Sequence, residues 1–399
     1  MTLLIDPPDA PGHGRLWSHL ASDASYDELH RFAQSLGIPQ RGFDRDHYDI
    51  PAERYDAVVA AGAKPVTSRE LVTRLLEAGL RRRKSETLAP RKPGRSLIRP
   101  ARLRAGDTVA VVAPAGPVVP ERLERGLDVL RGWGLDVRVG PHVLGHHERF
   151  GYLAADDAAR AEDLVHAWRD PDVRAVFCAR GGYGVQRMVD LLDWESIAAA
   201  GPKPLVGFSD VTALHQGFAA RLGLSTVHGP VVTSLGSGDD ASRSHLHRLL
   251  FEPEPGVTLV SGDTRTLVGG RAEGVLVGGN VALLAAELGT ANSLPAAASI
   301  AVLEEVGEEA YRLDRMLTQL LRSGWFDGVR GIVLGDFTDC GEPDSVQALV
   351  EDRLGPLGVP MLWGAQVGHG SRNLAFPYGV PAVLDADEGT LVLRQAPLL

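Results

Sequence analysis

The feature that most constrains the fold is a repeated alternation of apolar, strand-like runs with helical segments, from about residue 105 onward. DTVAVVAPA (107–115) is a β-type run, PERLERGLDVLRGWG (120–134) is a helical segment ended by glycine, and LDVRV (135–139) is another strand. Strands that alternate with helices in this way predict a parallel sheet covered by helices. A second set of such segments begins near residue 270, so we expect an α/β fold with two lobes, the first Rossmann-like.

A basic segment rich in proline separates these lobes from an N-terminal region with its own pattern. Between residues 80 and 104 the only acidic residue is Glu86, which is typical of an extended linker. Upstream, SYDE (25–28) and TSRE (67–70) have the capping-box pattern that starts helices. We therefore expect a small separate α/β domain at 1–80, a linker at 81–104, a first lobe at 105–235, an inter-lobe connection at 236–270 and a second lobe at 271–399.

The N-terminal domain also contains histidines and aspartates that raise the question of a metal site. Their spacing matches no strong metal-ligand motif, so we expect scattered surface side chains and no metal site. The residues in question are His19, Asp23, His30, Asp46, His47 and Asp49.

Charge and cysteine content exclude several classes of function. The formal net charge of −10 gives no electrostatic reason to expect nucleic-acid binding. Only Cys178 and Cys340 are present, both within apolar runs, so we expect core residues rather than a disulfide framework. The N-terminus has no signal-peptide pattern, and no apolar stretch approaches the ~20 residues of a membrane span. These observations predict a cytoplasmic protein with no membrane association.

Four short motifs carry candidate chemistry. In GFSD, Ser209 lies at a strand-to-helix junction, where it is either a helix cap or an exposed nucleophile. In CARGGYG, Gly181 and Gly182 follow an apolar strand, and their backbone amides can approach a ligand closely. VLEEV places acidic residues at a strand end, and GHGSRN places His369 in a glycine-containing loop. Each motif alone is also compatible with a turn or a solvated surface.

In this order along the chain, however, these motifs resemble the LD-carboxypeptidase and microcin-immunity family of serine peptidases. GDTVAVVAPAGPV, RAEDL, HGP, GGN and LEEVGEEAYRLDRML add to the match, which covers most of residues 96–399. The resemblance implies that Ser209 is the nucleophile, Glu304 the acid and His369 the base. The region before the linker resembles a small uncharacterised bacterial domain, which implies no activity.

The implied chemistry has a physical account. His369 takes the hydroxyl proton of Ser209, and Glu304 orients the imidazole and stabilises its cation. The amide of Asp210 and one from Gly181 or Gly182 are the candidate oxyanion donors. No cofactor is expected.

The choice between the two glutamates of VLEEV is the sharpest question. Strand alternation places Glu304 and Glu305 on opposite faces, so both cannot face one cleft while the strand continues. Periodicity leaves the choice open, and the resemblance selects Glu304.

The resemblance also implies a substrate. We expect a carboxypeptidase that releases the terminal D-alanine from murein tetrapeptides in cell-wall recycling, acting on a muropeptide or small peptide. The alternatives are a microcin-immunity hydrolase of peptidyl or aminoacyl nucleotides and a non-catalytic peptide-binding module. Residues 236–274 contain no Trp or Tyr and a single Phe251, which favours murein over a nucleotide base. For the oligomeric state, we consider a homodimer.

Overall fold

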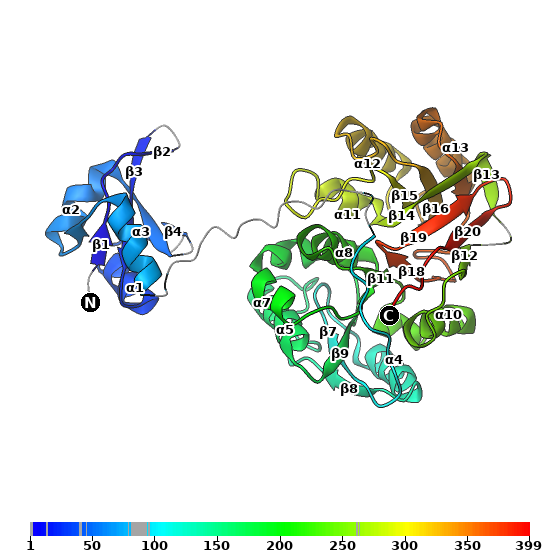
Figure 1. Cartoon of the computed structure of the whole chain (residues 1–399), viewed down its shortest axis with the longest axis horizontal. Helices are drawn as coiled ribbons and strands as arrows, with labels where there is room; N and C mark the ends of the chain where they lie inside the picture. Colours follow the sequence, from blue (N-terminus) through cyan, green and yellow to red (C-terminus); the bar gives the residue numbers. More distant parts are fainter. Residues whose placement is uncertain are drawn as a thin grey trace. The chain divides into compact units, whose positions relative to one another are not determined.

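The chain folds into two compact units, Met1–Thr87 and Leu88–Leu399 (Figure 1). The structure, a computed structural model, describes residues 3–399 except 13–14, 40–41, 45, 79, 81–93, 95, 261 and 263. Most of the predicted linker therefore lies outside the described residues. Within the described part of the chain, no helix has both the length and the apolar character that crossing a membrane requires.

The first unit is a mixed sheet covered by helices. Its strand order is β4-β5-β3-β1-β6, with β2 paired to β3, and all its pairings except β1–β6 are antiparallel. The strands are β1 (Leu3–Ile5), β2 (Ala10–Gly12), β3 (Arg15–Ser22), β4 (Phe43–Asp44), β5 (His47–Pro51) and β6 (Lys64–Pro65). The helices are α1 (Tyr26–Ser35), α2 (Tyr55–Ala60), α3 (Ser68–Glu77) and the short η2 (Ala52–Arg54).

Both predicted capping motifs start helices in this unit. The Ser25 hydroxyl accepts a hydrogen bond from the Glu28 amide at 3.2 Å, at the start of α1. The Thr67 hydroxyl accepts one from the Glu70 amide at 3.2 Å, beside α3. These side chains satisfy amides that have no partner within a first helical turn, so the predicted helix starts are confirmed.

The first sheet of the second unit is the predicted parallel sheet, with helices covering both of its faces. Its order is β18-β11-β10-β9-β7-β8, parallel except for β18. Val109 and Val111 pack into one hydrophobic cluster and Ala110 and Val112 into another, as expected of a strand buried on both faces. The strands are β7 (Thr108–Val112), β8 (Asp136–Val139), β9 (Val173–Cys178), β10 (Leu205–Gly207), β11 (Thr226–His228) and β18 (Phe376–Tyr378).

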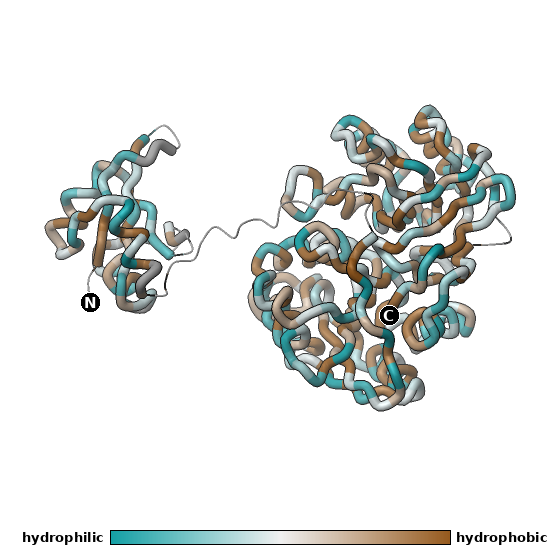
Figure 2. The backbone as a smooth tube through the Cα atoms, viewed as in Figure 1, coloured by the Kyte–Doolittle hydropathy of each residue, from teal (hydrophilic) through white to brown (hydrophobic). Residues whose placement is uncertain are grey.

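The second sheet of this unit has a parallel centre and antiparallel margins. Its order is β12-β20-β19-β14-β15-β16-β17-β13, with β14 to β17 parallel to one another. The hydrophobic residues concentrate along these strands (Figure 2). The strands are β12 (Thr258–Val260), β13 (Arg265–Val268), β14 (Arg271–Asn280), β15 (Ser299–Val306), β16 (Gly331–Thr338), β17 (Met361–Trp363), β19 (Pro381–Asp385) and β20 (Thr390–Leu393).

Helices connect and cover the strands of this unit. They are α4 (Pro120–Gly132), α5 (Asp157–Arg169), α6 (Val185–Met188), α7 (Trp194–Ala199), α8 (Thr212–Gly217), α9 (Val232–Leu235), α10 (Asp240–Phe251), α11 (Val281–Ala286), α12 (Ala310–Arg322) and α13 (Pro343–Leu354). Shorter helical turns are η3 (Val189–Leu191), η4 (Ser209–Val211), η5 (Phe218–Leu222) and η6 (Gly355–Leu357). Cys178 and Cys340 are buried free thiols, as expected.

The two-lobed α/β class is confirmed, and strand pairing ties the two lobes together. β18, from the second predicted lobe, pairs with β11 of the first sheet. The segment predicted as a connection, 236–270, includes α10 and two strands of the second sheet, β12 and β13. The lobe boundaries themselves stay a prediction, because both sheets draw strands from across them.

Candidate active site

Ser209 lies on a strained turn between β10 and α8. Its φ angle is 65°, in the left-handed region that non-glycine residues rarely adopt. Such a conformation costs about 1–3 kcal/mol and persists only where the surrounding structure enforces it. The N-cap of the short helix η4 is Phe208, and no side chain caps it. The interpretation of Ser209 as a helix cap is therefore wrong.

The glycine loop after β9 packs directly against this turn. A Cβ atom placed on Gly181 would lie 2.9 Å from the Ser209 Cβ and 3.1 Å from its Oγ, so a side chain at position 181 would clash. Gly182 has a φ angle of 113°, which also favours glycine. The Gly116 amide, in the loop after β7, donates to the Gly181 carbonyl at 3.1 Å. Loops from the carboxyl ends of three parallel strands thus meet at Ser209, where ligands bind in sheets of this type.

The fully buried Glu304 forms a pair with the partly buried His369. His369 Nδ1 donates to Glu304 Oε2 at 2.6 Å, and the Glu304 side chain is 0% exposed, against 18% for His369. The Phe208 and His369 rings lie 4.8 Å apart, which brings the residue before Ser209 against the imidazole. The structure therefore brings Glu304, His369 and the Ser209 turn into one site.

Glycine is also required next to this pair. Gly368 has a φ angle of 122°, and a Cβ atom there would lie 2.8 Å from the Glu304 Cβ. The glycine before His369 thus lets the loop approach the Glu304 side chain closely.

Glu305 points into a different environment, as strand alternation predicts. Its Oε1 accepts from Asn280 Nδ2 at 2.7 Å and from the Val306 amide at 2.9 Å. Its Oε2 accepts from the Ala282 amide at 2.7 Å, in the first turn of α11. Burial raises the pKa of Glu305 to about 7, with a further contribution from the charge of Glu304, although these hydrogen bonds act in the opposite direction. Glu305 therefore joins β14, β15 and α11 rather than facing His369.

Asp336 supports the histidine loop, and the sequence analysis did not identify it. Its carboxylate accepts from the Gly370 amide at 3.0 Å, and its own amide donates to the Val367 carbonyl at 2.8 Å. Burial raises the pKa of Asp336 to about 6. The sequence signal that could have identified Asp336 is its position near the carboxyl end of β16, the parallel neighbour of β15.

Several charges act on the His369 imidazole. Burial acts to lower its pKa, but the hydrogen bond to Glu304 and the charge of that carboxylate outweigh burial and raise the pKa above its usual value. Glu305 and Asp336 contribute in the same direction. The imidazolium form is thus stabilised at this position.

Asp210 anchors the Ser209 turn to the neighbouring helix. Its Oδ2 accepts from the Val185 amide at 2.8 Å, at the start of α6. Burial raises the pKa of Asp210 to about 6. The Asp210 amide lies in the first turn of η4, where an N–H has no partner within the helix.

A cavity of about 260 Å³ lies beside His369. Within the described residues, Nδ2 of Asn373, which lines it, is buried without a hydrogen-bond partner, while its Oδ1 accepts from the Gly368 amide at 3.2 Å. The cavity is lined by Phe208, Pro230, Ser234, Leu235, Gly238, Asp239, Ser242, Arg243, Gly368, His369, Gly370, Ser371 and Asn373.

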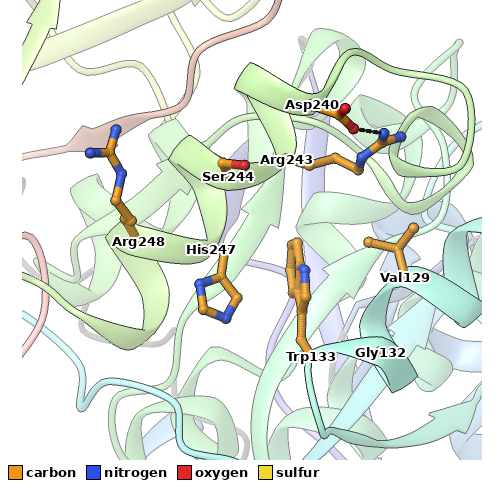
Figure 3. A pocket seen from close by; sticks show the side chains of 8 residues that line it. All are labelled: Val129, Gly132, Trp133, Asp240, Arg243, Ser244, His247 and Arg248. Carbon is orange, nitrogen blue, oxygen red and sulfur yellow. Dashed lines mark hydrogen bonds and ion pairs between the residues drawn. The ribbon is translucent and has the colours of Figure 1, made fainter.

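A larger depression of about 660 Å³ lies between α4 and α10, around Trp133 and His247 (Figure 3). None of Ser209, Glu304 and His369 lines it. We therefore place the candidate active site at the smaller cavity, which is lined by His369 and by Phe208, the residue before Ser209.

Three known families match parts of this chain. Residues 109–229 match the LD-carboxypeptidase N-terminal domain and residues 273–384 the LD-carboxypeptidase C-terminal domain. Residues 3–78 match a family described as a protein of unknown function (DUF4031).

Individual relatives are similar over most of their length. A Streptomyces coelicolor protein named as a carboxypeptidase is 57% identical over 306 residues, which are 76% of this chain and 98% of the relative. The murein tetrapeptide carboxypeptidase of Pseudomonas aeruginosa is 41% identical over 290 residues, 70% of this chain and 93% of the relative. The structure of the microcin C7 self-immunity protein MccF in complex with aspartyl sulfamoyl adenosine has a TM-score of 0.69 at 24% identity, and the match covers 76% of this chain and 100% of that protein.

Proposed function

The chain belongs to the LD-carboxypeptidase family of serine peptidases, and from this membership we propose that it releases the terminal D-alanine from murein tetrapeptides. A relative that is 41% identical is named a murein tetrapeptide carboxypeptidase, which supports this substrate class. The binding-module alternative is set aside, because the chain belongs to an enzyme family.

The observation that carries the mechanism is the Glu304–His369 hydrogen bond beside the strained Ser209 turn. With Nδ1 bonded to a fully buried carboxylate, Nε2 is the ring nitrogen that serves Ser209. His369 takes the hydroxyl proton while Ser209 Oγ attacks the carbonyl of the L–D bond. It then returns that proton to the departing D-alanine amine. Water activated by the same imidazole hydrolyses the acyl-enzyme and frees Ser209.

The negative charge that develops on the carbonyl oxygen needs donors beside Ser209. We assign this role to the Asp210 amide and to an amide of Gly181 or Gly182. The close packing of Gly181 on Ser209 supports the assignment. A donor of this kind contributes roughly 10²–10³ in rate in other hydrolases.

The environment of His369 suits its role as a base that becomes charged during the reaction. Glu304 raises the pKa of His369, because its charge favours the imidazolium form. The same interaction stabilises the imidazolium that forms while Ser209 attacks. Acylation requires neutral His369, so we expect the rate to rise with pH through the pKa of this group.

The cavity beside His369 is the proposed site for the end of the peptide. Its buried Asn373 amide and the Ser371 hydroxyl can donate to peptide oxygens, and Phe208 provides an apolar wall. Hydrolysis of an aminoacyl nucleotide is the second candidate. It is tested because MccF, whose solved structure contains aspartyl sulfamoyl adenosine, has the same fold; at 24% identity the similarity extends to the fold and not to the substrate.

The test is incubation of the purified chain with murein tetrapeptide, followed by mass detection of the tripeptide and free D-alanine. Aminoacyl sulfamoyl adenosine is the second substrate, and Ser209→Ala is the matched control. We expect turnover of the tetrapeptide by the unmodified chain only. Turnover of the nucleotide alone would favour the second candidate, and turnover of neither would contradict both.

A further inference from the structure

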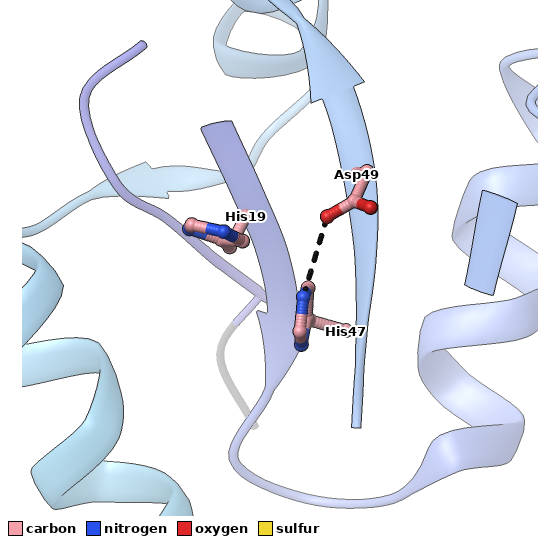
Figure 4. A group of neighbouring side chains, drawn as sticks. All are labelled: His19, His47 and Asp49. Carbon is pink, nitrogen blue, oxygen red and sulfur yellow. Dashed lines mark ion pairs between the residues drawn. The ribbon is translucent and has the colours of Figure 1, made fainter. Parts of the chain in front are cut away.

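A group of histidine and aspartate side chains lies on one face of the first unit's sheet (Figure 4). His47 and Asp49 are two residues apart in β5, so their side chains point to the same face. His19, in β3, is the direct cross-strand partner of Asp49. Potential ligand atoms of the three side chains lie within 4.8 Å of one another. Sequence spacing predicted scattered surface residues, but the strand register brings these three together.

Buried carboxylates orient both imidazoles. His19 Nδ1 donates to Asp6 Oδ2 at 2.9 Å, and the Asp6 side chain is 2% exposed. His47 Nδ1 donates to Asp46 Oδ1 at 2.7 Å, and the Asp46 side chain is 1% exposed. A carboxylate on Nδ1 fixes the tautomer and directs Nε2 to the other side of the ring, which is how proteins orient metal-binding histidines.

We propose that His19, His47 and Asp49 bind a divalent transition-metal ion, with Asp6 and Asp46 holding the two imidazoles. His47 Nε2 is 3.3 Å from Asp49 Oδ1, so an imidazole nitrogen and a carboxylate oxygen already face each other. Two imidazoles and one carboxylate suit zinc and its neighbours rather than magnesium or calcium, which prefer oxygen ligands.

The exposure of the group indicates an open site. The exposed fractions of the side chains are 34% for His19, 14% for His47 and 45% for Asp49. Three protein ligands at a solvent-accessible position leave coordination positions for water or another molecule, unlike a closed structural zinc site. The site is independent of the proposed peptidase mechanism, because none of its residues belongs to the second unit.

The other possibility is a cluster of His47 with Asp46 and Asp49 that binds no metal. The test uses the full chain, freed of metal by a chelator and titrated with Zn²⁺, Co²⁺ and Mg²⁺. We expect one Zn²⁺ or Co²⁺ bound per chain by calorimetry, visible absorption from the Co²⁺ complex, and much weaker Mg²⁺ binding. No Zn²⁺ or Co²⁺ binding would overturn the proposal in favour of the cluster that binds no metal.

Variants separate this site from other histidines. Asp49→Asn and His47→Gln should weaken Zn²⁺ binding and remove the Co²⁺ absorption. Asp46→Asn, which removes the orienting charge, should weaken binding about 10–100-fold.

The matched control is His30→Gln in the same unit. His30 is outside the group, and its Nδ1 lies 2.8 Å from the Tyr48 hydroxyl. Asp49 is the most exposed of the three, so Asp49→Asn should fold. Unchanged binding in that variant, with an unchanged circular dichroism spectrum, would overturn the assignment.

Discussion

Histidines held by carboxylates occur in both units of this protein, and their surroundings differ. In the second unit, Glu304 fixes the imidazole of His369 in a site that also contains the strained Ser209 turn. In the first unit, Asp6 and Asp46 fix His19 and His47 on an open sheet face. The local pair is the same, because a carboxylate on Nδ1 sets the tautomer in each case.

What lies on the Nε2 side of the ring decides the chemistry that such a pair supports. A single imidazole beside a serine hydroxyl supports proton transfer and acyl chemistry. Two imidazoles that converge on one point, together with a further carboxylate that orients neither of them, support cation binding. The comparison therefore predicts that changes in the second unit affect turnover, while changes in the first unit affect metal binding.

The largest expected effect comes from the nucleophile. Ser209→Ala should lower kcat for the murein tetrapeptide by about 10⁴-fold or more, since it removes the hydroxyl that we propose as the nucleophile. Steady-state kinetics with mass detection measures the loss, and Zn²⁺ binding should not change. A folded Ser209→Ala chain that retained near-normal turnover would remove Ser209 from the mechanism.

The next effect tests which carboxylate serves His369. Glu304→Gln should lower kcat about 10³–10⁴-fold, because an amide neither stabilises the imidazolium nor fixes the tautomer reliably. Since Glu304 raises the pKa of His369, the acid limb of any residual activity should also move to lower pH.

Glu305→Gln is the matched control for Glu304→Gln. It should retain substantial activity, but its free energy of unfolding should fall by about 1–3 kcal/mol. The NH₂ group of glutamine would face an N–H donor of the backbone or of Asn280, where a carboxylate oxygen now accepts a hydrogen bond. If Glu305→Gln loses more activity than Glu304→Gln, with both folded by circular dichroism, Glu304 is not the acid.

A smaller effect is expected on how the free energy of unfolding depends on pH. The pKa of Glu305 is raised to about 7, so the folded state binds its proton more tightly than the unfolded state. The contribution of Glu305 to the free energy of unfolding is fully present below the pKa of the unfolded state and is lost as pH rises to about 7. At ~1.4 kcal/mol per pKa unit, the total loss is on the order of 3 kcal/mol. Asp210 and Asp336, each raised to about 6, act in the same direction.

Urea unfolding at pH 5 and pH 8 measures this loss of stability. Glu305→Gln should reduce the difference between the two pH values. The total is not decisive by itself, because burial lowers the pKa values of His215 and His228, which act in the opposite direction. A difference between the two pH values that is the same in Glu305→Gln and in the unmodified chain would contradict the raised pKa of Glu305.

The smallest expected effect is on turnover when the first unit is removed. A chain that starts at Ser96 keeps the backbone hydrogen bonds from Leu97 to Gly379 and from Ile98 to Gly223, which belong to the second unit. We expect its kcat/KM for the tetrapeptide to stay within about two-fold of the full chain and its Zn²⁺ binding to be lost. A folded truncated chain that loses most of its turnover would give the first unit a catalytic role.

Much of the fold could be predicted from local patterns. The strand and helix alternation, the caps at Ser25 and Thr67 and the opposite faces of Glu304 and Glu305 follow from backbone geometry within a few residues. For the site, the motifs left Ser209 and His369 open and the family resemblance selected them. The structure brings the Ser209 turn and His369 into contact through Phe208. The catalytic roles stay predictions that the experiments above test.

The sequence by itself determined the alternation of strands and helices and the residues at several of their ends, although it did not show α10, β12 and β13 within 236–270. Only the tertiary structure decided which of those ends meet. Asp336 reaches the histidine loop because β16 lies beside β15, and His19 meets Asp49 because of the β3–β5 register. Periodicity and capping act over a few residues, whereas register and strand order depend on contacts between segments that are far apart in the chain.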